Sequence, residues 1–405
     1  MSSPREGLDH SQAQEARAHA ALTKTALQRL AVAVVVIVGA FILTVSTSRT
    51  DYLSYWSAGK LLRDHADPYS STRVFALEKA QGYSDIRPLI MRNPPWALFI
   101  AAPLGFVGLR IGLFLWTLAL MGCVVGSVRL LKLPSRVRAF AYVFAPAVAA
   151  IYGGQSAPFV LLGFCLFLRL NRRRPFLAGL SLLLMTLKPH LFLVFWAVLL
   201  ADCIYRRRFS ILAGGAVGLM AGSILALFLD KHVFSHFNGL LHSFLLQHEV
   251  FPTISMHFRM LVDPRAFWLL FVPSALATVW GLWYYWRSKH EWQWATHGLL
   301  LVLIAILVSP YGWFTDEAVL LPCIGYALAN PGKRKYSDWM LLIINTVTLF
   351  IVFVLRLSMS SRAYLWTPVT WLAWFLYATY KPERNSTLQT AGTDTPGENS
   401  SLTAL

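Results

Sequence analysis

Residues 30–60, LAVAVVVIVGAFILTVSTSRTDYLSYWSAGK, indicate the class of fold. The run Leu30–Ser46 is apolar, follows about thirty mostly polar residues and is not followed by a small-x-small cleavage site. It therefore predicts an uncleaved first membrane helix and not a secretory signal. Shortly after it, Asp51 opens a segment with two tyrosines and a tryptophan, which would place a carboxylate and an aromatic cluster at the membrane surface.

The composition is that of a membrane protein with many helices. Of the 405 residues, 56% are hydrophobic and only 14% are charged, which is too apolar for a soluble domain. The chain is long enough for about twelve spans, so we expect an all-α polytopic membrane fold. The formal net charge is +17, but Lys and Arg occur in short clusters between apolar runs, as the positive-inside bias requires. Nucleic-acid binding is therefore not expected.

The basic clusters alternate with breaks in the apolar runs from residue 129 onward. We assign the clusters to the cytoplasm and the breaks to the outer face. The clusters lie at Lys24 and Arg29, and at residues 129–138, 172–174, 206–208, 287–289, 333–335 and 381–384. The breaks lie at residues 153–155, 188–190, 230–263, 309–316 and 359–363.

The transmembrane domain is expected to cover residues 27–380. The polar segments 1–26 and 381–405 lack a packed apolar pattern and are expected to be disordered cytoplasmic tails. Residues 95–130 are too long for one span and short for two. We interpret them as a half-inserted helix over 95–107 followed by a full span over 110–130.

Two long outer loops are predicted, at about residues 49–94 and 230–264. Apolar and polar residues at helical spacing predict helices lying along the membrane surface in both loops. These helices are expected over Tyr52–Arg63, Ser71–Gln81 and Val233–Leu246.

Polar side chains of the outer breaks are expected to meet at one face of the molecule. Such groups at the ends of membrane helices line a cavity or coordinate a ligand, or else they reach the interface as amphipathic side chains. The residues concerned are Asp51, Gln155, Lys188, His190, His248, Glu249, Arg259 and Asp316.

Three of these residues have two interpretations each. Asp51 precedes a helix-like run, so it is either a helix N-cap or a general base, and both roles can coexist. Lys188, beside a helix-breaking proline, either reaches the membrane interface or binds an anionic head group. Asp316 either caps the next helix or lines the site.

Metal and nucleotide sites are not expected. His232 and His236 are one helical turn apart, but no acidic cluster completes a metal site, and interfacial or hydroxyl contacts are favoured. The four cysteines lie in apolar segments without metal-like spacing and should be packing residues. No glycine-rich phosphate loop is present, so a soluble nucleotide donor is not expected.

Four segments resemble glycosyltransferase family 87, the polyprenyl-phosphate-mannose-dependent mannosyltransferases of the GT-C class. The segments are Asp51–Tyr69; Asn93–Trp96 with Pro103; Gly154–Gln155 through Arg174 and Ala178–Gly179 to Lys188–Pro189; and Ser309–Tyr311 with Asp316. The resemblance implies a GT-C-type bundle of about twelve helices, an extracytoplasmic active site and a lipid-phosphate sugar donor. Residues 81–92 and 253–259 depart from the family pattern, which leaves the acceptor and the sugar open.

The family's acidic base in the first outer loop corresponds to Asp51. A polyprenyl phosphate leaves as an anion without protonation, so one base and nearby cations suffice and no metal or cofactor is required. We expect inverting transfer of a hexose, with mannose the first candidate. Lys188, His190 and Arg259 are the expected phosphate-binding residues.

The remaining candidate residues would contact the sugar or the acceptor. They are Tyr52, Tyr55, Trp56, Gln155, His248 and Asp316. The expected partners are the bilayer, a polyprenyl-phosphate-linked sugar and a glycolipid or glycan acceptor at the plasma or inner membrane. A lipid or sugar transporter is the alternative, but it predicts internal symmetry and polar groups at mid-membrane depth, and neither pattern is found in the sequence.

Overall fold

The computed structural model describes residue 39 and residues 51–243, 251–330, 335–359 and 361–379. Every regular element in these ranges is a helix, so the all-α class is confirmed. The predicted tails, most of the first helix and His248 lie outside the described residues.

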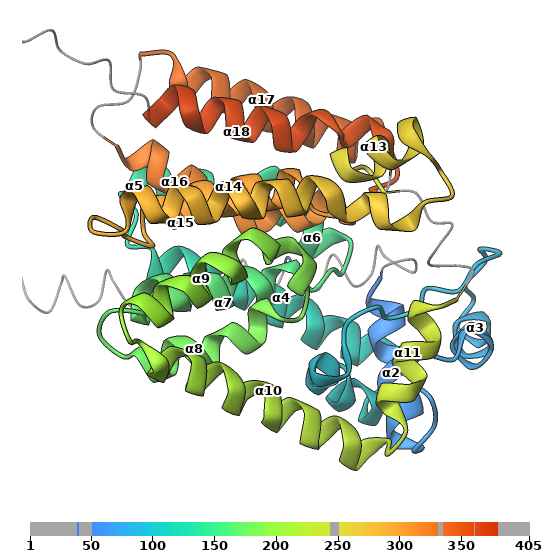
Figure 1. The fold of residues 1–405 in the computed structure, drawn as a ribbon. Helices are drawn as coiled ribbons and strands as arrows, with labels where there is room; N and C mark the ends of the chain where they lie inside the picture. The colour runs from blue at the N-terminus through green and yellow to red at the C-terminus, as the bar shows by residue number, and fades with distance from the viewer. Residues whose placement is uncertain (1–38, 40–50, 244–250, 331–334, 360, 380–405) are drawn as a thin grey trace, which may run out of the picture.

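Most helices run side by side in one bundle (Figure 1). Its α-helices are α4 Leu109–Leu130, α5 Ser135–Tyr142, α6 Ala145–Tyr152, α7 Ala157–Leu170, α8 Pro175–Met185, α9 Leu193–Tyr205, α10 Phe209–Leu229, α14 Val272–Ser288, α15 His297–Leu307, α16 Leu321–Ala329, α17 Ser337–Phe353 and α18 Trp366–Thr379. Short 3-10 helices precede or connect several of them, namely η1 Pro95–Ile100, η2 Ala102–Phe106, η3 Pro189–Phe192, η4 Phe267–Phe271, η5 Phe314–Leu320 and η6 Arg362–Tyr364.

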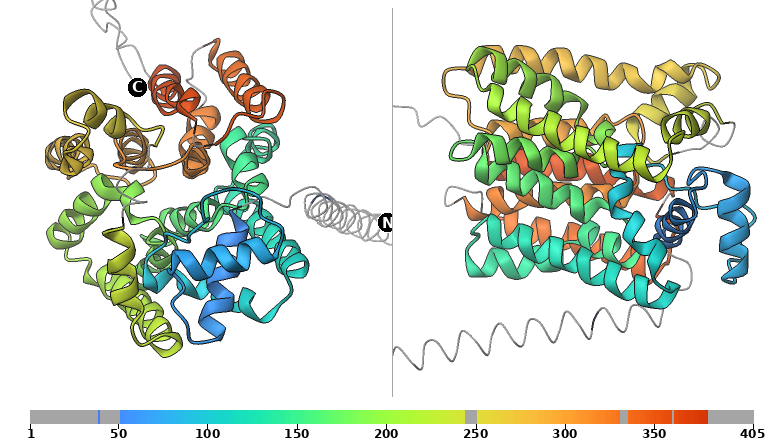
Figure 2. Two further views of the ribbon diagram at one scale, coloured as in Figure 1. Left: turned by 90° about the vertical axis from the view of Figure 1, so that its right-hand side faces the viewer. Right: turned by 90° about the horizontal axis from the view of Figure 1, so that it is seen from below.

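Four short helices gather at one end of the bundle, on the right in Figure 1. They are α2 Tyr52–Arg63, α3 Ser71–Ala80, α11 Val233–Leu241 and α13 Ile254–Val262. The sequence predicts α2 at its observed bounds and α3 to within one residue. Helix α11 ends at Leu241, and residues 244–246 of the helix predicted there lie outside the described residues. The connections α7–α8, α9–α10 and α14–α15, which carry basic clusters, lie at the opposite end (Figures 1 and 2). The bundle therefore separates the basic connections from the predicted outer loops.

Three helical segments are long and apolar enough to cross a membrane: Leu109–Leu130, Phe209–Leu229 and Phe267–Ser288. Several shorter apolar helices of 10–17 residues accompany them. These helices suit a membrane protein, and the number of about twelve spans stays a prediction.

The predicted division of residues 95–130 is confirmed in part. A single 22-residue helix, α4, follows a compact segment, as expected. That segment is not one half-inserted helix but two 3-10 helices, η1 and η2, each of which contains a proline at its start. Proline lacks the backbone donor that a continuous helix needs, so it favours such short turns.

Helix α2 is enclosed by protein, and its predicted position along the membrane surface stays a prediction. Most of its residues are buried, including Leu62 at 0% exposure. The reason is a close backbone approach between α2 and η2. A Cβ atom on Gly59 would lie 2.3 Å from Ala101 O, and one on Gly105 would lie 2.1 Å from Gly59 O. Only glycine pairs allow two backbones this close, so η2 packs directly on α2 at this contact.

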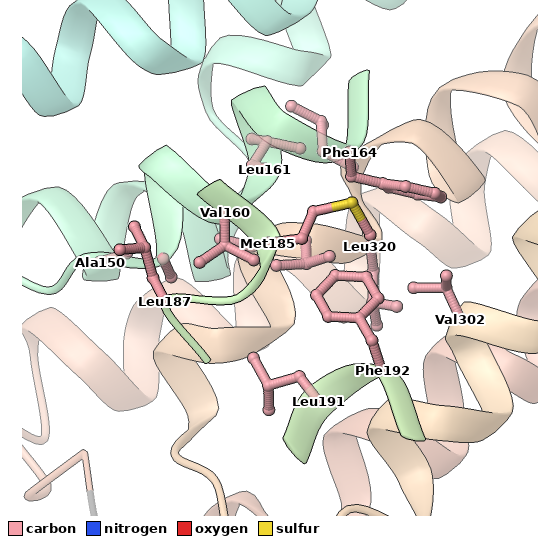
Figure 3. Packing of buried hydrophobic residues seen from close by; sticks show 14 of the residues in the cluster. Ala150, Val160, Leu161, Phe164, Met185, Leu187, Leu191, Phe192, Val302 and Leu320 are labelled. Carbon is pink, nitrogen blue, oxygen red and sulfur yellow. The ribbon is translucent and has the colours of Figure 1, made fainter. Parts of the chain in front are cut away.

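The packed interior lies directly beneath the loop that carries Lys188. Phe164 of α7, Met185 of α8, Phe192 of η3 and Leu320 of η5 pack together with no exposed surface (Figure 3). Side chains packed this closely each make many favourable van der Waals contacts, which stabilise the bundle. This cluster fixes the end of α8 and the start of α9 on either side of Lys188, and it fixes η5 before α16.

Candidate active site

Asp51 precedes α2, but its side chain does not cap the helix. The backbone of Asp51 is helical, and no cap hydrogen bond from its carboxylate is present. Instead its backbone N–H donates to Gly153 O at 3.0 Å, and its Oδ2 accepts a hydrogen bond from Gln155 Nε2. The structure thus favours a role other than capping for this carboxylate.

Gln155 lies in the turn between α6 and α7, 104 residues from Asp51 along the chain. Gly154 in this turn has φ +68°, a left-handed conformation that glycine adopts without strain. This conformation lets the chain leave α6 and present the Gln155 amide toward Asp51. Trp116 of α4 donates from Nε1 to Gly154 O at 2.9 Å and braces the turn.

Lys188 connects Gln155 to Asp316. Its Nζ donates to Gln155 Oε1 at 3.1 Å and to Asp316 Oδ1 at 2.5 Å, and the lysine is only 5% exposed. The chain leaves the helical path over residues 186–188, between α8 and η3, because Pro189 cannot continue a helix. Four predicted site residues, Asp51, Gln155, Lys188 and Asp316, therefore form one hydrogen-bonded chain, which we call the Asp51 network.

Asp316 caps η5, as one of its two interpretations predicted, and also pairs with Lys188; its role in lining the site stays a prediction. Its Oδ2 accepts from the backbone N–H of Trp313 at 3.0 Å, which caps η5, while its Oδ1 pairs with Lys188. The residue is 1% exposed. Because each oxygen has its own donor, the cap also fixes the carboxylate that holds Lys188.

The network's charges favour an ionised lysine. Burial alone would lower the pKa of Lys188, but the acidic groups Asp316, Tyr55 and Asp51 outweigh it and raise the pKa above its ordinary value. Burial raises the pKa of Asp51, and Lys188, the Gln155 hydrogen bond and Arg92 oppose this rise. The raised pKa makes Asp51 more basic than an ordinary aspartate, which suits a proton acceptor.

Arg92 is a cation of this site that the sequence analysis did not identify. Its guanidinium carbon lies 5.4 Å from the centre of a Trp313 ring, and Lys188 Nζ lies 5.6 Å from the same residue's ring. It is also close enough to Asp51 to lower that residue's pKa. The signal available in the sequence was its position directly before the Asn93-Pro94-Pro95-Trp96 segment.

The aromatic residues of α2 support the site from within the protein. Tyr52, Tyr55 and Trp56 are 1%, 4% and 5% exposed. Tyr55 donates to Ser156 Oγ at 2.9 Å, and its ring lies 4.8 Å from that of Trp116. Their predicted stacking on a sugar or lipid stays a prediction, since protein covers all three rings in this structure.

The side chains of Trp56 and Tyr52 anchor the two ends of this aromatic group. Trp56 donates from Nε1 to Val107 O at 3.1 Å. The Tyr52 hydroxyl packs closely on Gly112 of α4: a Cβ atom added to this glycine would lie only 2.1 Å from the hydroxyl oxygen. It is buried and has no hydrogen-bond partner in the described part of the chain. These contacts hold α2, and with it Asp51, against α4.

Of the other predicted phosphate-binding residues, His190 lies within electrostatic reach of Lys188, whereas the contacts of Arg259 are with the turn after α13. The His190 ring packs against the Tyr311 ring with centres 3.9 Å apart and the two planes tilted by 32°. The Arg259 guanidinium donates to Pro264 O at 2.5 Å and lies 5.4 Å from the centre of the Phe267 ring, so part of it braces the turn after α13. His248 lies outside the described residues.

The histidines of the second outer loop contact acidic side chains. His236 Nδ1 lies 2.7 Å from Asp230 Oδ2 and 3.6 Å from Asp67 Oδ1. Together with His232 these residues line part of a cavity of about 560 Å³ between the α2–α3 loop and the end of α10. Within the described residues, no group of three His, Cys, Asp or Glu side chains could hold a metal ion. The expectation of a metal-independent reaction stays a prediction.

The model of glycosyltransferase family 87 matches residues 92–310, more than half of the chain. The chain belongs to glycosyltransferase family 87. The resemblance seen in the sequence is confirmed, and the protein is a glycosyltransferase of the GT-C superfamily. No curated protein and no solved structure matches it. Gln155 and Lys188 lie inside the residues matched to family 87, whereas Asp51 and Asp316 lie before and after them.

Proposed function

We propose that this glycosyltransferase moves a hexose, with mannose as the first candidate, from a polyprenyl-phosphate sugar to an acceptor hydroxyl on the extracytoplasmic face of the membrane. The observation that supports this most is the Asp51 network. It joins the partly exposed Asp51 carboxylate, through Gln155, to the buried Lys188 cation at the end of the bundle where the short helices gather. General base catalysis needs a held carboxylate near a hydroxyl, and a phosphate leaving group needs positive charge.

In this mechanism Asp51 takes the proton of the acceptor hydroxyl. The hydroxyl oxygen forms a bond to the anomeric carbon of the sugar as the bond from that carbon to the phosphate oxygen breaks. The electron pair leaves with the polyprenyl phosphate, and attack from the opposite side inverts the anomeric configuration. Asp51 Oδ2 accepts from Gln155, and Oδ1 makes no hydrogen bond within the described residues, so Oδ1 is the atom assigned to the proton.

Two features support a lipid-linked donor over a soluble one. The sequence has no glycine-rich phosphate loop, and long apolar helices flank the site. A donor anchored in the bilayer reaches such a site by diffusion in the membrane plane.

The test is a transfer assay with the purified full-length chain. Radiolabelled polyprenyl-phosphate mannose, and separately the glucose form, is incubated with protein and a membrane lipid extract. Transfer of label to a product is expected, and NMR of the product's anomeric carbon reports retention or inversion. Translocation of the donor across liposomes without transfer would overturn the proposal in favour of a transporter.

Asp51→Asn is the key variant in this assay, and Asp64→Asn is its matched control. Asp64 lies just after the other end of α2 and forms only an exposed pair with Arg63. Asp51→Asn should lower transfer by roughly 100-fold or more, while Asp64→Asn should retain it. Full activity of Asp51→Asn at normal expression would reject the base assignment.

A further inference from the structure

The Gln155 amide has only one orientation that satisfies the Asp51 network. An ammonium group only donates, so the Gln155 atom facing Lys188 must be the carbonyl oxygen. The amide nitrogen then faces Asp51 and donates to Oδ2. Because the amide N–H already occupies Oδ2 and the amide nitrogen cannot take up a proton at neutral pH, Oδ2 stays unprotonated while this contact is made. The proton is then transferred to Oδ1.

Lys188 is already engaged by groups on both sides. It is 5% exposed, and two of its three donors are used on Gln155 and Asp316. Asp316 is itself held by the Trp313 N–H, so the ammonium has a fixed position. A lysine that bound the leaving phosphate directly would have to give up part of this arrangement.

Arg92 is better suited to the phosphate. It is less deeply buried than Lys188 and lies against Trp313, the residue that also contacts the ammonium. A planar guanidinium binds two phosphate oxygens at once, which a lysine does not. The two cations therefore lie on the same aromatic residue but in different surroundings.

We infer that Lys188 and Gln155 are positioning residues that fix Asp51 for proton transfer, and that Arg92 is the cation that receives the donor phosphate. This division of roles rests on the proposed function and deepens it. It replaces the assignment of Lys188 as a phosphate ligand. It also gives Gln155 a defined role, because the amide transmits the position of Lys188 to one oxygen of Asp51.

The charges around Asp51 set the direction of the expected pH effect. Lys188 and Arg92 favour the ionised form and Asp316 opposes it, while Tyr55 and Glu78 are also within electrostatic reach. Removing Lys188 removes the strongest of the influences that lower the pKa of Asp51, so this pKa rises further. Since the base works deprotonated, the acid limb of the kcat/KM profile should move to higher pH.

The experiment measures pH profiles and donor KM for the full-length chain with radiolabelled polyprenyl-phosphate mannose and a membrane lipid extract. For Lys188→Met we expect kcat to fall at least tenfold and the acid limb to rise by about one pH unit or more, with donor KM changed less than about threefold. Lys188→Arg should restore the position of the limb. For Arg92→Gln we expect roughly a tenfold rise in donor KM and a smaller shift of the limb.

The opposite pattern would overturn the inference. If Lys188→Met raised donor KM about tenfold and left the acid limb in place, Lys188 would be the phosphate ligand. Should Lys188→Met fail to fold, Gln155→Glu decides, because a carboxylate beside Asp51 must move the limb upward if this contact controls the base. An unmoved limb in Gln155→Glu rejects the role of Gln155. Failure of the proposed function is a separate result, since the unmodified chain would then transfer no sugar.

Discussion

Two buried ion networks lie near opposite ends of helix α9, and they differ in how completely their groups are paired. Near the last turn of α9, Asp202 pairs with Arg206 four residues later at 2.8 Å. Its two oxygens also accept from Tyr285 at 3.1 Å and from Trp294 at 3.0 Å. Before the other end of α9, Lys188 holds Gln155 and Asp316 in the Asp51 network.

The difference between the networks indicates different tasks. Asp202 and its partner belong to one helical turn, and two further side chains complete its hydrogen bonding, which is typical of a structural tie. The Asp51 network joins residues 33 to 128 positions apart, and its lysine holds one carboxylate directly and the other through the Gln155 amide. A carboxylate with one oxygen held and the other left for a substrate is suited to proton transfer.

The largest expected effect separates the two networks by rate. Asp51→Asn should lower sugar transfer by roughly 100-fold or more while leaving the melting temperature in detergent nearly unchanged. The reason is that asparagine has the same size and shape as aspartate, and its side-chain oxygen can still accept the hydrogen bond from Gln155 Nε2. Transfer rate and thermal unfolding are measured on the same preparation. If Asp51→Asn lowered the melting temperature but transferred sugar at the normal rate per folded molecule, Asp51 would be a structural residue and not the base.

Asp202→Ala should show the converse. Removing one partner of a buried pair costs about 3–5 kcal/mol of folding free energy, because Arg206, Tyr285 and Trp294 lose their acceptor. Activity per folded molecule should remain within about twofold, as for residues that do not act in the transition state. Denaturant unfolding of the two proteins measures the cost. Unchanged stability would show that this network is not a structural tie.

The docking of α2 is the next largest effect. Gly59→Ala places a methyl group 2.3 Å from Ala101 O, so we expect a loss of about 1–3 kcal/mol and reduced transfer as Asp51 shifts. Gly239→Ala in α11 is the matched control, since a Cβ atom there would meet nothing within 4 Å. It should stabilise the chain by up to about 1 kcal/mol through helix propensity. Equal effects of the two variants on unfolding would contradict the close approach.

Another buried carboxylate, Glu317, tests whether helix α18 supports the Asp51 network. Glu317 follows Asp316 and accepts from Thr367 at 2.6 Å and from Trp371 at 2.8 Å, both on α18. In Glu317→Gln the side-chain NH2 faces either the Thr367 hydroxyl or the Trp371 N–H, so one hydrogen bond to the carboxylate is lost. This loss should lower the free energy of unfolding by about 1–3 kcal/mol. Thr367→Val should cost less. Transfer and unfolding measured together would show whether the loss of this tie reaches Asp316, and an unaffected unfolding curve would refute the tie.

The smallest effect concerns pH. Burial raises the pKa of Glu78 in α3 to about 7, and the Leu89 N–H hydrogen bond opposes part of this rise. The folded chain therefore keeps a proton that the unfolded chain releases near its ordinary value of 4.5. This contribution to stability is present below pH 4.5, is lost as pH rises to about 7 and is level above it. Glu78→Gln should flatten this part of the melting-temperature profile, and an unchanged slope would contradict the assignment.

Local sequence patterns were sufficient for several parts of the fold. Apolar runs and turn signals predicted the bounds of α2 and nearly those of α3, because helix periodicity and the Asp67-Pro68 turn depend on neighbouring residues. The alternation of basic clusters and breaks also predicted that Asp51, Gln155, Lys188 and Asp316 would approach one another. Their catalytic roles stay predictions.

The sequence by itself determined an all-helical chain of family 87 with its polar breaks at one end of the bundle, since composition, spacing and charge carry that information locally. Only the tertiary structure decided which atoms pair. Arg92 and Glu317 do not belong to any periodic pattern in the sequence. The enclosure of α2 depends on the contact between Gly59 and Gly105, which are far apart along the chain. Such contacts arise when packed helices bring distant residues within a few ångströms, which no local pattern encodes.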